Sequence, residues 1–244
     1  MTEKRELYAN VTLPDLTVVI VTYDRPVEIR RTITALQEHL HYDGHVRWHL
    51  ADDGTGGDYV PALVQDYPNL GWSWTITGRG GWGRNVNRAL AAVETDHVFL
   101  CEDDYVAHDD LDLNAGVLVM DTVGAGIVRY DGLSGHLGLR LTVLEAETTR
   151  GVIPYLEIDR DASTHLNVYS NRPHLRHQPR LLAALGPYPE GLPLGQTETT
   201  YAHWVREVPD CPPVVILQNG VRRAFEHIGK SRQLTALDVR DGEA

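Results

Sequence analysis

The apolar segment His97–Cys101 ends in three consecutive acids, Glu102, Asp103 and Asp104. A short apolar run bounded by polar residues is typical of a buried strand in a parallel sheet. Carboxylates that are crowded at the end of a strand repel one another, so they need a compensating charge. A hard divalent cation meets that need, because it prefers oxygen ligands and shares them with phosphate groups. The alternative is a solvated acidic turn that caps the following segment.

Stretches with strand and helix patterns alternate through the first hundred residues. Apolar, β-branched or aromatic runs predict strands at residues 16–22, 45–51, 71–77 and 97–101. Helical spacing of apolar residues predicts helices at residues 26–40, 59–67 and 83–93. This alternation predicts an α/β fold with a parallel sheet, in which ligands bind at the carboxyl ends of the strands.

The second half of the chain is less regular. We predict helices at residues 109–120 and 198–206, and strands at residues 124–130, 137–145 and 214–218. Residues 160–193 are rich in proline, histidine, asparagine and arginine, which predicts substrate-facing loops on the edge of the sheet. Residues beyond 232 are polar and predict a frayed tail.

Charge and composition exclude several classes of protein. The 244 residues are 42% hydrophobic and carry a formal net charge of −12, which argues against a protein that coats nucleic acid or an anionic membrane. Two cysteines make neither a disulfide framework nor a four-cysteine zinc site. The first residues are charged and no stretch is long enough to span a bilayer, so we expect a soluble cytoplasmic protein without a transmembrane segment.

Four short motifs follow one another in the chain: Val18–Pro26, Ala51–Thr55, Gly83–Asn87 and Glu102–Asp104. Together they resemble the GT-A glycosyltransferases, in particular the inverting family 2 group. The first resembles that family's opening strand and loop, and the second and third are similar to its "DDGS" and "ARNxG" signatures. The fourth lies where the family has its metal-binding DxD motif, here with Glu in place of the first Asp. The resemblance covers residues 14–106 and continues only at Glu198 and residues 227–231.

The resemblance implies a GT-A fold, which is Rossmann-like, with a mostly parallel central sheet flanked by helices and a loop-rich C-terminal acceptor region. It implies a single domain over residues 1–244. Residues 14–106 would bind the nucleotide sugar, residues 107–232 would bind the acceptor, and residues 233–244 would form the tail. The implied activity is metal-dependent transfer of a sugar from a nucleoside-diphosphate sugar to an acceptor hydroxyl with inversion, and a UDP-sugar is the favoured donor.

The residues expected to hold the donor follow the first, second and fourth strands or begin a helix. Carboxylates accept hydrogen bonds from a base and ribose, and an arginine with free amides at a helix start binds a diphosphate. The alternatives are an ordinary turn at Asp53-Gly54 and a solvated helix end at Arg84. The full set is Thr22, Tyr23, Arg25, Asp52, Asp53, Arg84, Asn85, Glu102, Asp103, Lys230 and Ser231.

The resemblance also implies a site for Mn²⁺ or Mg²⁺. Asp104 would bind the ion directly, and Glu102 would reach the ribose or a metal-bound water. His227 would complete the metal shell, although a lone histidine is as often a hydrogen-bonded structural residue. A divalent ion there would stabilise the charge that grows on the departing nucleoside diphosphate.

Inverting transfer needs a general base that takes the proton of the acceptor hydroxyl. Many relatives carry this base in an acidic pair at the start of a late helix. Here Gln196 and Thr197 replace that pair, which leaves Glu198 as the candidate base and Glu190 as the reserve. Glu198 would otherwise belong to a capping arrangement or a solvated helix face.

The acceptor is a glycan, a small molecule or a modified nucleic acid. Residues 171–180 gather Arg172, Arg176 and Arg180 with two histidines in an otherwise acidic chain. One hypothesis is that this segment faces an anionic acceptor or a nucleotide phosphate. The alternative is a histidine-rich structural loop held by hydrogen bonds.

Three other functions compete with this interpretation. Gly78–Gly83 matches G-x-G-x-x-G between a predicted strand and a helix, which is a feature of NAD(P)-dependent oxidoreductases. That motif follows the third predicted strand rather than the first, however, and no single acid stands in a clear ribose-binding strand. Nucleotidyltransferases commonly carry a Gly-rich, Arg/Lys-bearing loop after the first strand, where this chain has Thr22–Pro26. A non-catalytic module that binds a nucleotide sugar is the third alternative.

Overall fold

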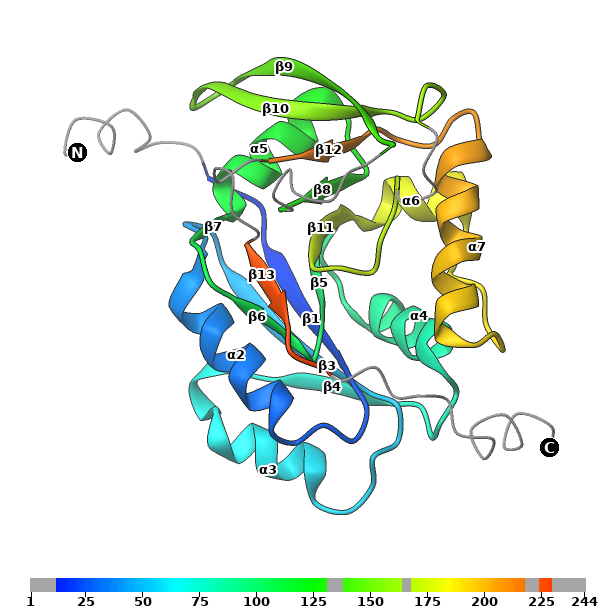
Figure 1. Cartoon of the computed structure of the whole chain (residues 1–244). Helices are drawn as coiled ribbons and strands as arrows, with labels where there is room; N and C mark the ends of the chain where they lie inside the picture. The colour runs from blue at the N-terminus through cyan, green and yellow to red at the C-terminus, as the bar shows by residue number, and fades with distance from the viewer. Residues whose placement is uncertain (1–11, 131–137, 164–167, 218–223, 230–244) are drawn as a thin grey trace.

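The computed structural model describes residues 12–130, 138–163, 168–217 and 224–229, and its centre is a nine-stranded sheet (Figure 1). The strand order is β4-β3-β1-β5-β11-β8-β12-β10-β9. In chain order these strands are β1 (Leu16–Thr22), β3 (Val46–Asp52), β4 (Ser73–Ile76), β5 (His97–Glu102), β8 (Ile127–Arg129), β9 (Arg140–Thr148), β10 (Gly151–Asp159), β11 (His174–His177) and β12 (Val214–Ile216).

Two short ladders lie beside the main sheet. One pairs β2 (Leu40–His41) with β7 (Leu111–Asp112), and the other pairs β6 (Tyr105–Ala107) with β13 (Phe225–His227). The α-helices are α2 (Glu28–His39), α3 (Tyr59–Asp66), α4 (Trp82–Ala92), α5 (Leu113–Val123), α6 (Gln178–Leu185) and α7 (Leu194–Glu207), with a short 3₁₀ turn at Pro68–Leu70. Among the described residues, no helix combines the length and apolar character that a membrane crossing requires.

The first four strands of the sheet are parallel, as the alternation of strands and helices predicted. Their register aligns the strand ends, because Thr22 pairs with Asp52 and Val21 pairs with Glu102. The loops that follow β1, β3 and β5 therefore leave the sheet at one edge. This edge is where an open α/β sheet binds its ligands.

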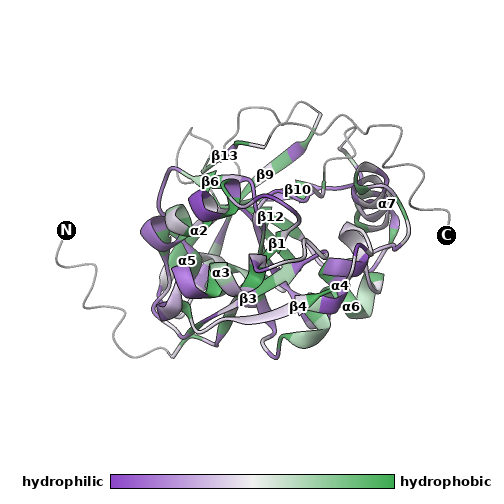
Figure 2. Cartoon of the chain, turned by 90° about the horizontal axis from the view of Figure 1, so that it is seen from below, coloured by the Kyte–Doolittle hydropathy of each residue, from purple (hydrophilic) through white to green (hydrophobic). Residues whose placement is uncertain are grey.

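Alternate side chains of the inner strands enter two separate apolar layers. Val18 and Ile20 pack with α2, α3 and α5, whereas Val19 and Val21 pack with α4, α6 and α7. The view from below shows the sheet between these two groups of helices (Figure 2). Strands that are buried on both faces need apolar residues throughout, which explains the continuous apolar run of β1.

The second half of the sheet is mixed rather than parallel. β11 pairs antiparallel with both β5 and β8, and the β9–β10 hairpin forms one edge of the sheet. The sequence prediction missed β10, and it began α5 too early. Asp112 caps α5 by accepting a hydrogen bond from the Ala115 N–H at 3.0 Å, and Gly124 ends the helix in the left-handed conformation with φ of +70°.

The prediction of edge loops over residues 160–193 was wrong for its central part, because β11 lies inside the sheet and α6 follows it directly. Arg176 on β11 is only 2% exposed, and its guanidinium donates to the Tyr188 hydroxyl and lies 5.0 Å from the centre of that ring. Arg180 donates to the carbonyls of Met120 and Ala125, both at 3.0 Å. Both arginines therefore have structural roles, so they do not face an anionic acceptor.

Candidate active site

Asp103 joins the end of β5 to the loop that follows β1. Its Oδ2 accepts hydrogen bonds from the Thr22 hydroxyl at 2.8 Å and from the Tyr23 N–H at 3.2 Å. Burial raises the pKa of Asp103 to about 6, against the lowering effects of the Thr22 hydrogen bond and the Arg25 charge. Thr22 and Asp103, both expected to bind the donor, thus hold the two loops together.

Asp104 is 4% exposed and has one satisfied and one unsatisfied oxygen. Its Oδ2 contacts the Arg25 guanidinium and lies 3.0 Å from His227 Nε2. Its Oδ1 is buried and has no hydrogen-bond partner among the described residues, and the same is true of Glu102 Oε1. Buried polar atoms without partners are rare, and a bound cation is one way to satisfy them.

Burial shifts the pKa values of two of the expected metal ligands, Glu102 and His227. Burial raises the pKa of Glu102 to about 8, and the negative charges of Glu198 and Asp103 act in the same direction. Burial and the charges of Arg25 and Arg172 lower the pKa of His227. His227 is therefore mainly neutral at pH 7, which is the form of imidazole that binds metals.

His227 reaches Asp104 through the β6–β13 ladder, in which it pairs with Tyr105. Its ring lies 4.9 Å from the Tyr105 ring. Tyr105 follows directly after the acids, so this ladder carries a histidine from the end of the chain to the tip of β5. The structure thereby brings together two of the three side chains expected to bind the metal, Asp104 and His227. Among the described residues, the ligand atoms of Glu102, Asp104 and His227 do not form a group within 4.8 Å of one another.

The two acids at the end of β3 accept hydrogen bonds from other residues of the chain. Asp52 accepts hydrogen bonds from the Gly54 and Thr55 N–H groups at 3.1 and 2.9 Å, and from the Thr55 hydroxyl at 2.5 Å. Asp53 accepts from the Thr77 hydroxyl at 2.6 Å and from the N–H groups of Gly80 and Gly81 at 2.7 and 3.0 Å. Asp53 therefore fixes the glycine-rich loop beside the strand ends, as part of the same site.

The two residues expected to bind a diphosphate at the start of α4 differ in position. Arg84 is exposed, whereas Asn85 is fully buried and donates to the Ala51 carbonyl at 2.8 Å. Asn85 thus holds α4 against β3 in this structure, and its amide does not face solvent. Lys230 and Ser231 lie outside the described residues.

Glu198 lies on α7, across the site from β5. Its Oε1 accepts hydrogen bonds from the Ser170 hydroxyl at 3.1 Å and from the Asn171 N–H at 2.9 Å. Because its charge acts on the Glu102 carboxyl, the two acids are close in space. The reserve candidate Glu190 instead accepts a hydrogen bond from the Asn87 amide at 2.8 Å.

Comparison with models of known sequence families shows to which family the chain belongs. The model of glycosyl transferase family 2 matches residues 17–174, which is more than half of the chain. The chain belongs to glycosyl transferase family 2. This membership confirms the resemblance to the GT-A glycosyltransferases of family 2.

Solved structures show the same fold at low sequence identity. The crystal structure of Staphylococcus aureus TarS 1–349 is 15% identical with a TM-score of 0.62, and the match covers 86% of this chain and 59% of that one. The mannosyltransferase PcManGT from Pyrobaculum calidifontis, in complex with GDP-Man and Mn²⁺, is 16% identical with a TM-score of 0.59 and coverage of 98% and 66%. The chain thus spans 59% of the length of TarS 1–349. Comparison with curated proteins gave no match.

Two residues of the candidate site lie in segments that the sequence analysis named but were not among the expected site residues. Arg79 lies in the glycine-rich loop with its guanidinium 5.0 Å from the centre of the Tyr23 ring. It adopts a left-handed φ of +62°, and Asp24 in the facing loop adopts +50°. Non-glycine residues in this region are strained and cluster at functional sites. A non-glycine residue with positive φ cannot be recognised from sequence.

The second missed residue is Gly229, which follows β13. A Cβ atom added there would collide with Asp104 Oδ2 and with the Arg25 guanidinium. The absence of a side chain at this position therefore leaves room for the contact between Asp104 Oδ2 and the Arg25 guanidinium. No local turn signal marks Gly229 in the sequence, because the crowding comes from residues more than a hundred positions away.

We expect Gly229→Ala to weaken Mn²⁺-dependent binding of a nucleoside diphosphate at least about tenfold, because the added methyl displaces Asp104 or Arg25 (about 1.4 kcal/mol). Isothermal titration of UDP or GDP with and without Mn²⁺ measures the change. Gly195→Ala is the matched control, since a Cβ there meets nothing within 4 Å. Equal affinity in wild type and Gly229→Ala would show that the space beside Asp104 is not used.

Proposed function

We propose that this glycosyltransferase moves a sugar from a nucleoside-diphosphate sugar to an acceptor hydroxyl, with inversion and with Mn²⁺ or Mg²⁺. The observation that carries the proposal is Asp104, whose Oδ1 is buried without a partner among the described residues while its Oδ2 lies 3.0 Å from His227 Nε2. Glu102 Oε1, at the end of β5, is likewise buried without a partner. Carboxylates and an imidazole suit Mn²⁺. Glu102 Oε1 and Asp104 Oδ1 have no hydrogen-bond partner among the described residues, whereas Asp104 Oδ2 contacts Arg25 and His227.

The metal would be held by Asp104 and His227, with Glu102 beside it as a direct ligand or through water. When bound, the ion supplies a Lewis acid that stabilises the diphosphate leaving group. The Arg25 guanidinium already contacts Asp104, so it lies where a diphosphate next to the ion would be. Arg84 at the start of α4 and Arg79 above Tyr23 add exposed cations to the same side of the site.

Glu198 is the proposed general base. The acceptor oxygen attacks the anomeric carbon on the face opposite the leaving diphosphate, and its proton passes to the Glu198 carboxylate. The hydrogen bonds from Ser170 and from the Asn171 N–H use Oε1 and fix the direction of the carboxylate. Oε2 is then the oxygen available to the acceptor hydroxyl.

The donor is a UDP-sugar or a GDP-sugar in our proposal. TarS 1–349 has been crystallised with UDP and with UDP-GlcNAc, and PcManGT with GDP-Man and Mn²⁺. The acceptor remains a glycan, a small molecule or a modified nucleic acid. Among the arginines of residues 171–180, Arg172 is the one whose charge acts on His227, and it is the candidate for an acceptor contact.

A screen of nucleotide sugars with and without Mn²⁺, scored by release of the nucleoside diphosphate, tests the proposal. UDP-sugars come first and GDP-Man second. We expect release that depends on the metal and increases with a suitable acceptor. Metal-dependent binding without turnover on any acceptor would favour the non-catalytic binding module instead. Thermal stabilisation by NAD(P) but not by nucleoside diphosphates with Mn²⁺ would contradict the nucleotide-sugar assignment.

A further inference from the structure

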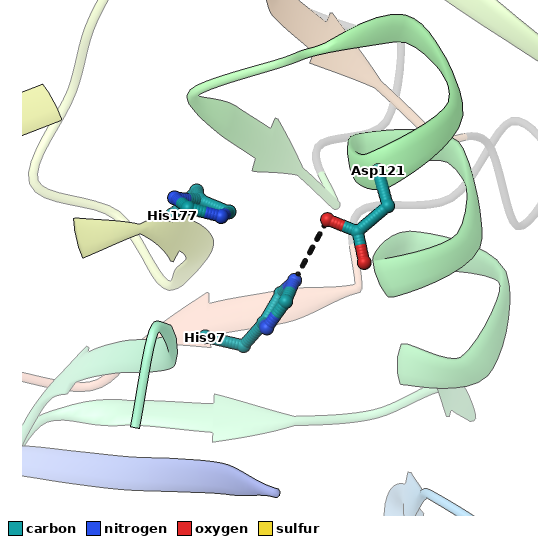
Figure 3. A group of neighbouring side chains, drawn as sticks. All are labelled: His97, Asp121 and His177. Atoms are coloured by element: carbon teal, nitrogen blue, oxygen red, sulfur yellow. Dashed lines mark hydrogen bonds and ion pairs between the residues drawn. The ribbon is translucent and has the colours of Figure 1, made fainter. Parts of the chain in front are cut away.

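A second group of metal-binding side chains lies at the opposite end of β5 from the acids. His97 begins β5 and His177 ends β11, and the two residues pair directly across these neighbouring strands. Their rings meet edge to face, with centres 5.1 Å apart. Asp121 reaches them from α5, and its Oδ1 lies 3.0 Å from His97 Nε2 (Figure 3).

We propose that His97, Asp121 and His177 bind a divalent transition metal of the Zn²⁺ type. One ligand atom from each of the three residues lies within 4.8 Å of the other two. Ligand atoms around tetrahedral Zn²⁺ are about 3.3 Å apart, given metal–ligand distances of about 2.0 Å. Side-chain rotations that move each ligand atom by roughly an ångström would bring the three atoms to this separation. A water molecule would then be the fourth ligand of the tetrahedral ion.

The burial of His97 favours a ligand over a purely structural role. His97 is 5% exposed, and the ring nitrogen that faces the cluster is Nε2, which lies 3.0 Å from Asp121 Oδ1. Its Nδ1 has no hydrogen-bond partner among the described residues. Its ring is held by the strand beneath it and by Asp121. The Asp121 side chain is 43% exposed, and His177 is half-buried, so an ion and its water can enter from solvent. The site thus combines a fixed imidazole with an accessible carboxylate.

The charges around the cluster leave a net negative site. Arg180 lies 3.4 Å from Asp121 Oδ1, but it is held by the Met120 and Ala125 carbonyls at the end of α5. Asp96, next to His97 in the chain, adds a negative charge that acts on His177. Burial and the nearby positive charges lower the pKa of His177, so its imidazole is neutral at pH 7.

The proposed metal is separate from the donor site. β5 contains six residues, which places the cluster roughly 17 Å from Glu102 along the strand. Two imidazoles and one carboxylate also suit Zn²⁺ better than they suit Mg²⁺. An ion here would join β5, β11 and α5, so its role is to stabilise the fold. This inference is independent of the proposed sugar transfer.

The test is binding of Zn²⁺ to the untagged chain after metal removal. Isothermal titration should give a site with micromolar affinity, and about 100 µM Zn²⁺ should raise Tm by about 5 °C or more. His177→Asn should abolish most of the Zn²⁺ binding and most of the rise in Tm. It should keep the N-cap of α6, because asparagine is itself a good N-cap residue. Asp121→Asn should do the same, and its remaining oxygen still accepts from His97 and Arg180.

Two controls separate this site from others. His203→Asn removes a different surface imidazole that faces a carboxylate, and it should leave Zn²⁺ binding unchanged. Asp104→Asn disables the donor metal site and should also leave Zn²⁺ binding by His97, Asp121 and His177 unchanged. X-ray absorption of the wild-type Zn²⁺ complex should show two imidazoles and a carboxylate. Absence of saturable binding, equal binding by wild type and His177→Asn, or an all-oxygen shell would overturn the proposal.

Discussion

Asp104→Asn should reduce sugar transfer at least about 10³-fold, which corresponds to about 4 kcal/mol of transition-state stabilisation. The substitution keeps the shape of the side chain and an oxygen that can accept from Arg25 and His227. It removes the negative charge that is proposed to hold the metal. Metal-dependent donor binding should therefore fall together with turnover. Steady-state rates across a range of Mn²⁺ concentrations, with Tm recorded for each variant, measure the effect.

Asp110→Asn is the control for the Asp104 experiment. Asp110 is an exposed acid close in sequence that pairs with His39 and His41, away from the strand ends. Its replacement should leave the rate and the Mn²⁺ dependence unchanged. Retention of more than about a tenth of the wild-type rate by Asp104→Asn would remove Asp104 as a metal ligand, since that rate corresponds to only about 1.4 kcal/mol.

The second large effect is expected at Glu198. Glu198→Gln should lower turnover by about 10² to 10⁴-fold, the range typical of a lost general base. Glutamine keeps an oxygen for the hydrogen bonds from Ser170 and Asn171, so the loop at residues 170–171 should hold its position. Donor affinity and Mn²⁺ affinity should change little. Single-turnover rates combined with titration of the donor separate these two effects.

Glu190→Gln is the matched comparison, because Glu190 was the reserve candidate and its carboxylate accepts from Asn87. We expect near-normal turnover from this variant. The opposite pattern, with Glu190→Gln inactive and Glu198→Gln active, would transfer the role of base to Glu190. Full activity in both variants would require a base from elsewhere, such as the acceptor itself.

Sequence patterns predicted the parallel half of the fold because its strands are buried on both faces. β1 is β-branched and apolar for nearly its whole length, and no other element type fits such a run between turns. β11 carries no such pattern. Its sequence His-Leu-Arg-His looks polar, but Arg176 is buried against the ring and hydroxyl of Tyr188. Tertiary contacts rather than local preference place this strand in the sheet.

The sequence pointed to those candidate-site residues that directly follow a predicted strand. Asp104 and Glu102 follow an apolar run, and together with the other three motifs this position pointed to a ligand site. Asn85 was harder to interpret, because the Ala51 carbonyl that its amide contacts is 34 positions away. The His97–Asp121–His177 cluster joins a strand, a helix and a second strand. Its members are up to 80 positions apart in the chain, so no spacing rule could group them.

The three-residue ladder between β6 and β13 is a small structural unit that holds His227 beside Asp104. So short a pairing contributes little stability of its own, although Phe225 stacks on Phe99 of the core with ring centres 6.3 Å apart. When these strands separate, Asp104 loses His227 while the main sheet stays intact. A donor and metal bound as proposed would contact Asp104 and His227 and would thereby stabilise the pairing of β13 with β6.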